Sequence, residues 1–175
     1  MFFSEKTRQE ISSILDYSIK DIELLRRALT RQSAISENNY SASEISYQRL
    51  EFIGDSLLNL IVTKLIYFYF PGCDSGVLSD IREKIICNKT LGGLALKLNI
   101  GKYLIIGKSE EMIHIRTHQK TLADVIEALT AVVYFDSNKD FQLTQKVVLK
   151  LLKNVILDIF IQRHCIFIKN TNNVI

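Results

Sequence analysis

Apolar residues along this chain recur mostly three and four positions apart, which is the repeat of an amphipathic helix and not the alternation of a half-buried strand. The chain contains a single proline, Pro71, and no convincing β-hairpin signal. The pattern therefore predicts an all-α protein. The expected helices cover about residues 4–16, 21–31, 48–70, 76–87, 89–98, 121–135 and 140–163.

Capping residues and helix breakers predict where several of these helices begin and end. Ser18 and Asp21 have the spacing of a capping box at the start of the second helix. Asn88 and Thr121 are the expected N-caps of two later helices. Pro71-Gly72 should end the helix that precedes it, because proline cannot continue the backbone hydrogen-bond pattern.

Three segments predict irregular structure. Residues 32–46 are rich in Ser, Asn and Glu and show no sustained period, so we expect a long surface loop there. Gly101 and Gly107 mark a second irregular segment. One domain is expected over residues 1–165, followed by a tail over 166–175 that is too short to fold alone.

Composition narrows the class of protein without identifying its function. At 175 residues the chain is long enough to bury about 70% of its unfolded surface in one core. Cys73, Cys87 and Cys165 have neither the C-x-x-C spacing nor the histidine partners of a zinc site, so we interpret them as reduced thiols. The net charge of +3 permits a polyanionic partner but does not require one.

The sequence predicts neither a signal peptide nor a membrane anchor. The N-terminus becomes charged at Glu5, which leaves no room for the apolar core of a signal peptide. The most apolar run, Leu57–Phe70, is shorter than the roughly 18–20 residues of a membrane span and contains Asn59 and Lys64. We therefore expect a buried helix in an intracellular protein, either cytoplasmic or nuclear.

Glu51 and Asp55 interrupt the apolar pattern of the helix expected at 48–70. A helix turns about 100° per residue, so the two carboxylates lie about 40° apart around its axis and one turn apart along it. Like charges at this spacing destabilise a helix by roughly 0.2–0.5 kcal/mol, and burying an unpaired carboxylate costs more. Some other interaction should offset this cost.

Asp124 and Glu127 repeat this arrangement on the helix expected at 121–135, where they project about 60° apart among apolar neighbours. If the two helices pack face to face, four carboxylates meet in a mostly apolar setting, and cations are needed to relieve their repulsion. Arg49 and Lys120 are close enough in sequence to contribute. Oxygen ligands without His or Cys favour Mg²⁺ or Mn²⁺. The alternative is that each pair is a solvent-facing polar stripe on its own helix and no metal binds, and spacing alone does not decide between the two.

Two sequence motifs carry a more specific signal. Tyr47–Leu58 reads YQRLEFIGDSLL and closely resembles the signature segment of the ribonuclease III family, and Thr121–Leu129, TLADVIEAL, resembles the second acidic motif of that family. Thr30–Ser33, TRQS, sits where the family has a Thr-His-Arg-Ser-like stretch, and residues 76–91 resemble the segment that links the two motifs. The resemblance covers about residues 8–160.

The resemblance implies an all-α, ribonuclease III endonuclease-type domain that forms a homodimer and cleaves double-stranded or hairpin RNA in RNA processing or silencing. It also implies Mg²⁺ as the cofactor, with Mn²⁺ as a substitute, and products with 5′-phosphate and 3′-hydroxyl ends. The residues that match the family's four metal-site acids are Glu51, Asp55, Asp124 and Glu127. Phe52 matches an apolar side chain that inserts into the partner subunit, and helical geometry points it away from the acids. The alternative for Phe52 is an ordinary core phenylalanine.

Several positions depart from the bacterial form of the family. Gln48 stands where bacterial members usually carry a glutamate, and both Gln48 and Lys120 resemble Dicer-type domains. We expect both residues to contact RNA, with an ordinary exposed lysine as the alternative for Lys120. Lys146, Lys150 and Lys153 form a basic stripe on the last expected helix, which would follow RNA phosphates or simply be a solvated helix face.

The resemblance does not extend to the double-stranded-RNA-binding domain that follows the nuclease domain in most bacterial members. We therefore expect the grip on RNA to come from the catalytic dimer or from a separate RNA-binding protein, with low affinity and a strong salt dependence. The rival function is a non-cleaving RNA-binding or scaffold protein on the same fold. The four carboxylates favour cleavage, because a scaffold has no use for acids that destabilise its core.

Overall fold

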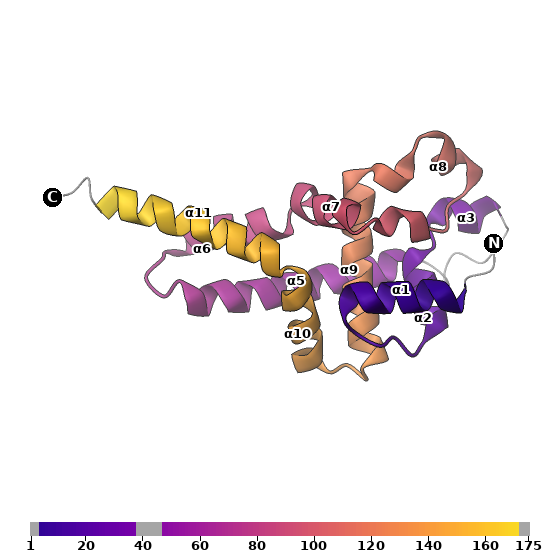
Figure 1. The fold of residues 1–175 in the computed structure, drawn as a ribbon, viewed down its shortest axis with the longest axis horizontal. Helices are drawn as coiled ribbons and strands as arrows, with labels where there is room; N and C mark the ends of the chain where they lie inside the picture. The colour runs from indigo at the N-terminus through magenta and orange to yellow at the C-terminus, as the bar shows by residue number, and fades with distance from the viewer. Residues whose placement is uncertain (1–3, 38–46, 172–175) are drawn as a thin grey trace.

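The computed structural model describes residues 4–37 and 47–171, with side chains up to Gln162, and is almost entirely helical over these ranges (Figure 1). The prediction of an all-α fold is confirmed. Within the described residues, the one β feature is an isolated parallel bridge between Thr30 and Ile105. The helices are α1 (Glu5–Leu15), α2 (Ile22–Leu29), α3 (Gln32–Glu37), α5 (Tyr47–Tyr69), α6 (Ser75–Ile86), α7 (Asn88–Lys97), α8 (Lys108–Met112), α9 (Gln119–Asp136), α10 (Phe141–Leu151) and α11 (Lys153–Thr171), with two short 3₁₀ helices, η1 (Ile100–Tyr103) and η2 (Ile115–Thr117).

The helices α5 and α9 cross at the centre of the molecule and supply much of its core (Figure 1). Every residue of α9 from Thr121 to Val133 is buried except Glu127, which is partly exposed. A helix enclosed on all sides has to be apolar around its whole circumference, which explains the run of Leu, Ala, Val and Ile in this segment. The other helices pack around this crossed pair.

A glycine allows α5 and α9 to approach closely. A Cβ atom built on Gly54 would lie 1.8 Å from the carbonyl oxygen of Glu127, so a side chain at this position would collide with the backbone of α9. Gly54 stands between Glu51 and Asp55 in sequence, and Glu127 belongs to the second acid pair. The close approach therefore occurs where both acid pairs lie.

A second glycine brings α7 against the start of α9. A Cβ atom built on Gly92 would lie 2.3 Å from the carbonyl oxygen of Gln119. The remaining helices cover other sides of the pair, with α2 and α10 against both helices, α6 along α5, and α11 on α6 (Figure 1). The start of α9 is thus fixed by α7 and its middle by α5.

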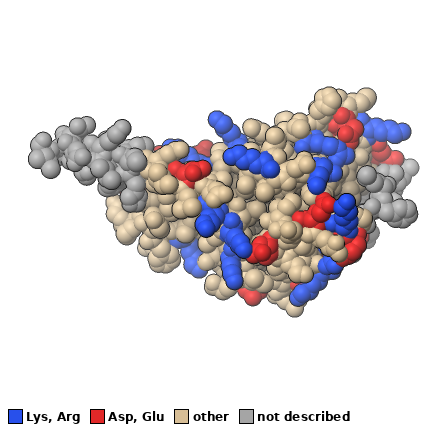
Figure 2. All heavy atoms as spheres, viewed as in Figure 1, with Lys and Arg blue, Asp and Glu red and all other residues tan. Residues whose placement is uncertain are grey.

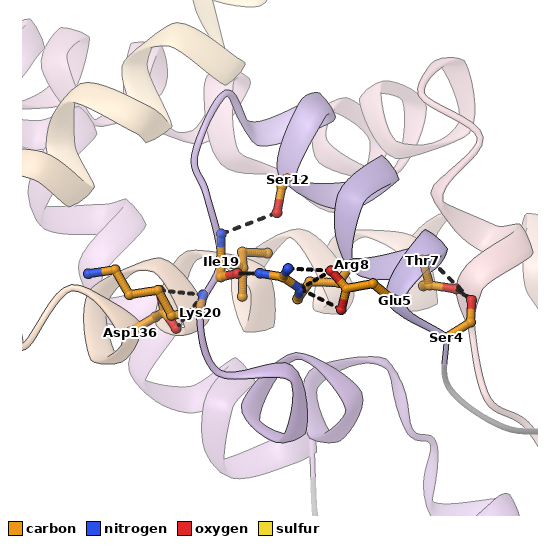
Figure 3. A network of polar contacts seen from close by, with 8 residues as sticks. All are labelled: Ser4, Glu5, Thr7, Arg8, Ser12, Ile19, Lys20 and Asp136. Carbon is orange, nitrogen blue, oxygen red and sulfur yellow. Dashed lines mark hydrogen bonds and ion pairs between the residues drawn. The ribbon is translucent and has the colours of Figure 1, made fainter.

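The N-terminal helix is fixed to the turn that follows it (Figure 3). Arg8 donates a hydrogen bond to the carbonyl oxygen of Ile19 and forms an ion pair with Glu5. The backbone N–H of Ile19 donates to the hydroxyl oxygen of Ser12 at 3.2 Å. These contacts hold the turn between α1 and α2 in one conformation.

Asp136, the last residue of α9, ties this turn to the core (Figure 3). Its carboxylate accepts hydrogen bonds from the backbone N–H of Lys20 at 3.0 Å and of Asp21 at 2.6 Å. The hydroxyl of Tyr17 donates to the same carboxylate at 2.7 Å. We call this arrangement of Asp136 with Tyr17, Lys20 and Asp21 the Asp136 clasp.

The prediction of a surface loop over residues 32–46 is wrong for its first part, because Gln32–Glu37 forms helix α3. Ala34 and Ile35 are buried, so tertiary packing stabilises a helix whose sequence shows no clear period. The carboxylate of Glu37 also accepts a hydrogen bond from the backbone N–H of Lys108 at 2.9 Å. Residues 38–46 lie outside the described residues.

Three expected N-caps differ in the structure. Asp21, and not Ser18, is the N-cap of α2, since its carboxylate accepts from the backbone N–H of Leu24 at 2.8 Å. Asn88 is already the first residue of α7, because a single residue separates α6 from α7. Thr121 is buried within α9, which begins two residues earlier at Gln119 where α7 packs against it.

The helix expected over residues 140–163 is two helices, α10 and α11, that meet at Leu152. Leu152 is fully buried, so the break lets α10 pack on the crossed pair while α11 turns onto α6. The helix α11 also continues to Thr171, past the expected end at 163, so the expected boundary between the domain and its tail falls inside a helix.

The helix α5 is long and apolar enough, by length and composition, to cross a membrane, and it is the one such helix among the described residues. A core helix of a globular protein meets the same two criteria. In this structure α5 packs against α9, α6, α10 and α2, and it buries Leu58, Ile61 and Val62 in the shared core. Its apolar character is therefore explained by packing within the protein.

Candidate metal centre

The crossing of α5 and α9 brings both acid pairs to one pocket. The pocket has a volume of about 450 Å³ and opens to solvent. The residues that line it are Tyr47, Gln48, Glu51, Phe52, Asp55, Lys120, Asp124 and Glu127. The alternative, in which each acid pair is a solvent-facing stripe on a helix that never meets the other, is therefore wrong as regards the separation of the two helices.

Three of the four acids come within reach of a single ion. Glu51, Asp124 and Glu127 each offer one carboxylate oxygen, and these oxygens all lie within 4.8 Å of one another. Asp55 lines the same pocket, and its Oδ1 accepts a hydrogen bond from the side-chain amide of Asn59 at 2.8 Å. A set of carboxylate oxygens without His or Cys fits a hard divalent cation such as Mg²⁺ or Mn²⁺.

The pKa values of Glu127 and Glu51 reflect their burial and then their crowding. Burial raises the pKa of Glu127 to about 8, and the negative charges of Asp55, Asp124 and Glu51 add to the rise. Burial also raises the pKa of Glu51, followed by the charge of Asp124. Each of these carboxyls thus holds a proton more tightly than usual, and a divalent cation would replace that proton.

Two cations flank Asp124, which is 6% exposed. The Nζ atom of Lys120 lies 3.3 Å from Oδ1 of Asp124, and this negative charge raises the pKa of the lysine. The Nη1 atom of Arg31 lies 3.6 Å from Oδ2 of Asp124. Arg49, the other cation expected near the acids, lies exposed on α5.

Sequence reasoning missed Arg31. It lies outside both acidic motifs, just before α3, where Arg31 N donates to the carbonyl oxygen of Ile105 at 2.9 Å, and its side chain reaches Asp124 from there. The available signal was the weak likeness of Thr30–Ser33 to a family stretch. That likeness indicated position in the fold but not contact with Asp124.

Gln48 and Phe52 lie at the rim of the pocket. Gln48 is exposed and lines the pocket beside the acids. Phe52 is 76% exposed, so it is not a core residue of this chain. Phe52 also borders the acid pocket, so the expectation that it points away from the acids is wrong.

The expected basic stripe does not reach the pocket. Lys146 and Lys150 belong to α10, whereas Lys153 begins α11 beyond the break. Lys150 forms an ion pair with Asp16, next to the Asp136 clasp at the far end of α9. Figure 2 shows basic and acidic side chains intermixed over one face of the molecule, without a single continuous basic track.

Comparisons with known proteins agree with the geometry. Residues 21–155 match the sequence profile of a family described as ribonuclease-III-like. A protein named Ribonuclease 3 from Francisella philomiragia is 41% identical over 143 residues, which cover 82% of this chain and 57% of that protein. A second protein of this name, from Chlorobium luteolum, is 42% identical over 130 residues, which cover 74% of this chain and 47% of that protein. The chain thus spans about half the length of the curated relatives that it matches.

Solved structures give the same picture. The nuclease domain of ribonuclease III from Campylobacter jejuni has a TM-score of 0.74 at 26% identity, covering 83% of this chain and 96% of that chain. Structural flexibility is described for that domain in a region involved in its dimer formation. Dicer from Pichia stipitis has a TM-score of 0.59 at 28% identity, covering 79% of this chain and 56% of that chain.

Proposed function

Because the chain belongs to the ribonuclease-III-like family, we propose that it is a metal-dependent endoribonuclease that hydrolyses double-stranded or structured RNA. One observation carries the proposal: Glu51, Asp124 and Glu127 converge within 4.8 Å in an open pocket at the crossing of α5 and α9. Acids that burial and mutual repulsion perturb, gathered in an open pocket, are typical of a functional site.

Mg²⁺ is the proposed cofactor, with Mn²⁺ as a substitute. Glu51, Asp124 and Glu127 would hold the ion. Asp55, which lines the same pocket, would add a fourth carboxylate near it. When bound, such an ion supplies a nucleophile from water near neutral pH and stabilises charge on a phosphate ester. The chain itself contributes positioned carboxylates and the exposed amine of Lys120, which is suited to contact a phosphate group. No side chain has to act as a nucleophile.

The proposed substrate is an A-form RNA helix or hairpin, cleaved to 5′-phosphate and 3′-hydroxyl ends. The open mouth of the pocket, lined by Gln48 and Lys120, supports access by a polymer and not only by a small ligand. Double-stranded RNA is recognised mainly by shape and by its 2′-hydroxyl and phosphate groups. A separate RNA-binding protein would strengthen a grip that otherwise rests on the pocket and its surroundings.

The protein is further proposed to act as a homodimer in which Phe52 enters the partner subunit. A phenylalanine that is 76% exposed beside the pocket supports this role, because such a side chain gains stability when a partner covers it. Phe52→Asp should therefore shift the dimer toward monomer in analytical ultracentrifugation. Phe68 is a matched control, since it is 72% exposed on the same helix near its other end. Phe68→Asp should leave the dimer intact, and dissociation by both variants or by neither would contradict the proposal.

Cleavage of an end-labelled RNA duplex at low salt tests the proposed function. The wild type should cut in Mg²⁺ and not in chelator, and Glu127→Gln should remove cutting while it leaves the fold intact. Glu23→Gln is the matched control, because Glu23 is an exposed acid that pairs with Arg26 away from the pocket. If the wild type binds the duplex but never cuts it in any metal, the rival function of a non-cleaving RNA-binding protein is supported instead.

A further inference from the structure

The two cations beside Asp124 face different oxygens of the same carboxylate. Lys120 lies by Oδ1 and Arg31 lies by Oδ2. They also differ in freedom, since the side chain of Lys120 is 62% exposed and that of Arg31 is 12% exposed. This difference in burial suggests different tasks for the two residues.

Arg31 is fixed by contacts on several sides. Its Nη2 lies 3.3 Å from Oε1 of Glu110, and its guanidinium carbon lies 4.6 Å from the centroid of the Tyr47 ring. Glu110 is itself held, because the hydroxyl of Ser33 donates to it at 2.6 Å. A planar guanidinium can make paired and stacked contacts at the same time. If the Arg31 side chain moved away, its contacts with Glu110, Tyr47 and Asp124 would all be lost.

Arg31 also has unused hydrogen-bonding capacity toward Asp124. Its Nε and Nη1 atoms are buried and have no hydrogen-bond partner among the described residues. The 3.6 Å between Nη1 and Oδ2 is an ion pair but is longer than a hydrogen bond. A small shift of the carboxylate would close this gap and hold Oδ2 more firmly.

Lys120 is not fixed in this way. Its pair with Asp124 spans four residues of one helix, and the lysine end of the pair is open to solvent although Asp124 is buried, so the pair is weak. A divalent cation between the carboxylates would compete with the lysine for the charge of Asp124. The flexible lysine side chain can leave, whereas Arg31 cannot.

We propose that Arg31 is a positioning residue that orients Asp124 in the metal site, and that Lys120 is a temporary counter-charge that leaves Oδ1 when a divalent cation binds. This inference rests on the proposed function, because it assumes a metal site at the crossing of α5 and α9. The Lys120 amine, once displaced, lies at the pocket rim where it is available to an RNA phosphate.

The proposal predicts opposite effects for two changes that remove the same charge. On charge alone, losing either cation should strengthen the binding of a divalent cation, because a nearby positive charge disappears. If Arg31 orients Asp124, its loss should weaken binding instead, since partners that orient a ligand typically contribute about 10-fold or more to metal affinity. Loss of Lys120 should strengthen binding by about twofold, in proportion to the weak ion pair.

The test is Mn²⁺ binding in the absence of RNA, followed by electron paramagnetic resonance of the free ion. Lys120→Met should lower the dissociation constant about twofold, and Arg31→Met should raise it about 10-fold or more. Arg31→Lys keeps the charge without the planar fork, so it should give an intermediate value. Arg26→Met removes a surface ion pair with Glu23 and serves as the control with unchanged binding.

A combined variant keeps the test decisive if Arg31→Met fails to fold. Arg31→Met with Glu110→Gln also removes the Glu110 carboxylate that would otherwise lose its partner, and it should show the same weakened binding. Unchanged or tighter Mn²⁺ binding in the folded Arg31 variants would overturn the positioning role of Arg31. Weaker Mn²⁺ binding in Lys120→Met would overturn the role of Lys120 as a counter-charge that the metal displaces. If the wild type itself binds no Mn²⁺, the proposed metal site fails and this inference fails with it, a result distinct from a failure confined to the variants.

Discussion

The carboxylates at the two ends of α9 have opposite surroundings. Asp136, at the end of the helix, accepts hydrogen bonds from two backbone N–H groups and the Tyr17 hydroxyl in the Asp136 clasp. Asp124, which lies 12 residues earlier and roughly 18 Å away along the helix, faces two cations and two other acids that converge on it.

The difference in partners separates a carboxylate that stabilises the fold from carboxylates that are available to a ligand. Three neutral donors from the turn between α1 and α2 hold the Asp136 carboxylate, so the fold itself supplies its hydrogen-bond partners. The pocket acids at the crossing of α5 and α9 are crowded instead: burial raises the pKa of Glu127 and of Glu51, and the charges of the neighbouring carboxylates add to the rise. Asp136 is therefore a structural residue, whereas we expect the acids of the pocket to serve a ligand from outside the chain, as in the proposed function.

The largest expected effect is the loss of RNA cleavage on mutation of Asp124, at the pocket end of α9. Asp124→Asn removes a charged metal ligand and should lower the rate of RNA cleavage about 1000-fold, equivalent to about 4 kcal/mol of the barrier. Circular dichroism should show an unchanged helix content. Cleavage by Asp124→Asn at the wild-type rate would contradict the role of the pocket.

The next effect concerns how the pocket is built. Gly54→Ala places a methyl group 1.8 Å from the carbonyl oxygen of Glu127, and the two helices must separate to accept it. The free energy of unfolding should fall by about 3 kcal/mol or more in urea denaturation. Gly93→Ala is the matched control, because a Cβ atom at Gly93 meets nothing within 4 Å, and it should be neutral or stabilising.

The Asp136 clasp should respond to mutation in the opposite way from the pocket. Asp136→Ala leaves two backbone N–H groups and the Tyr17 hydroxyl without their acceptor, so stability should fall by about 2 kcal/mol. Cleavage at a temperature where the variant is folded should stay near the wild-type rate. A loss of activity as large as that of Asp124→Asn would erase the distinction between the two ends.

The stability of the protein should depend on pH through Glu127, one of the pocket acids. The pKa of Glu127 in the folded protein, about 8, lies above its ordinary value of 4.5, so the folded state binds this proton more tightly than the unfolded state. The stability from this group is fully present below pH 4.5 and is lost as the pH rises through 8. In chelator, the wild type should therefore become less stable over this range, and Glu127→Gln should show a flatter profile. If the stability of Glu127→Gln depended on pH as the wild type does, a group other than Glu127 would be responsible for the pH dependence.

The smallest effect is expected for the lysines of α10. Lys150 is engaged with Asp16 beside the Asp136 clasp, so Lys150→Met should change RNA affinity by less than about twofold. Lys120→Met, at the pocket, should weaken RNA binding more than this when filter binding is measured at equal salt. A larger effect at Lys150 would instead indicate that RNA extends to the far end of α9.

Parts of this comparison follow from the sequence, and parts depend on tertiary contacts. The helical repeat and the two acidic motifs predicted α5, α9 and the four acids of the pocket, but not that Phe52 borders it. Arg31 was not predicted, because its contact with Asp124 depends on the bridge between Thr30 and Ile105, which are distant in sequence.

The errors in helix boundaries have the same origin. Helix α3 lacks a clear period and is stabilised by the burial of Ala34 and Ile35. The break at Leu152 is not marked by glycine or proline, and it places α10 and α11 on different neighbours. Local propensity alone does not reveal either feature.

Thermal unfolding of the wild type and Glu127→Gln, each in chelator and in Mg²⁺, tests most directly whether the pocket acids serve a metal and not the fold. We predict that Mg²⁺ at about 100 times its dissociation constant raises the melting temperature of the wild type by about 5–10 °C. Glu127→Gln should melt no lower than the wild type in chelator and should gain little from Mg²⁺. An equal rise in both proteins, or a marked loss of stability of the variant in chelator, would contradict the account.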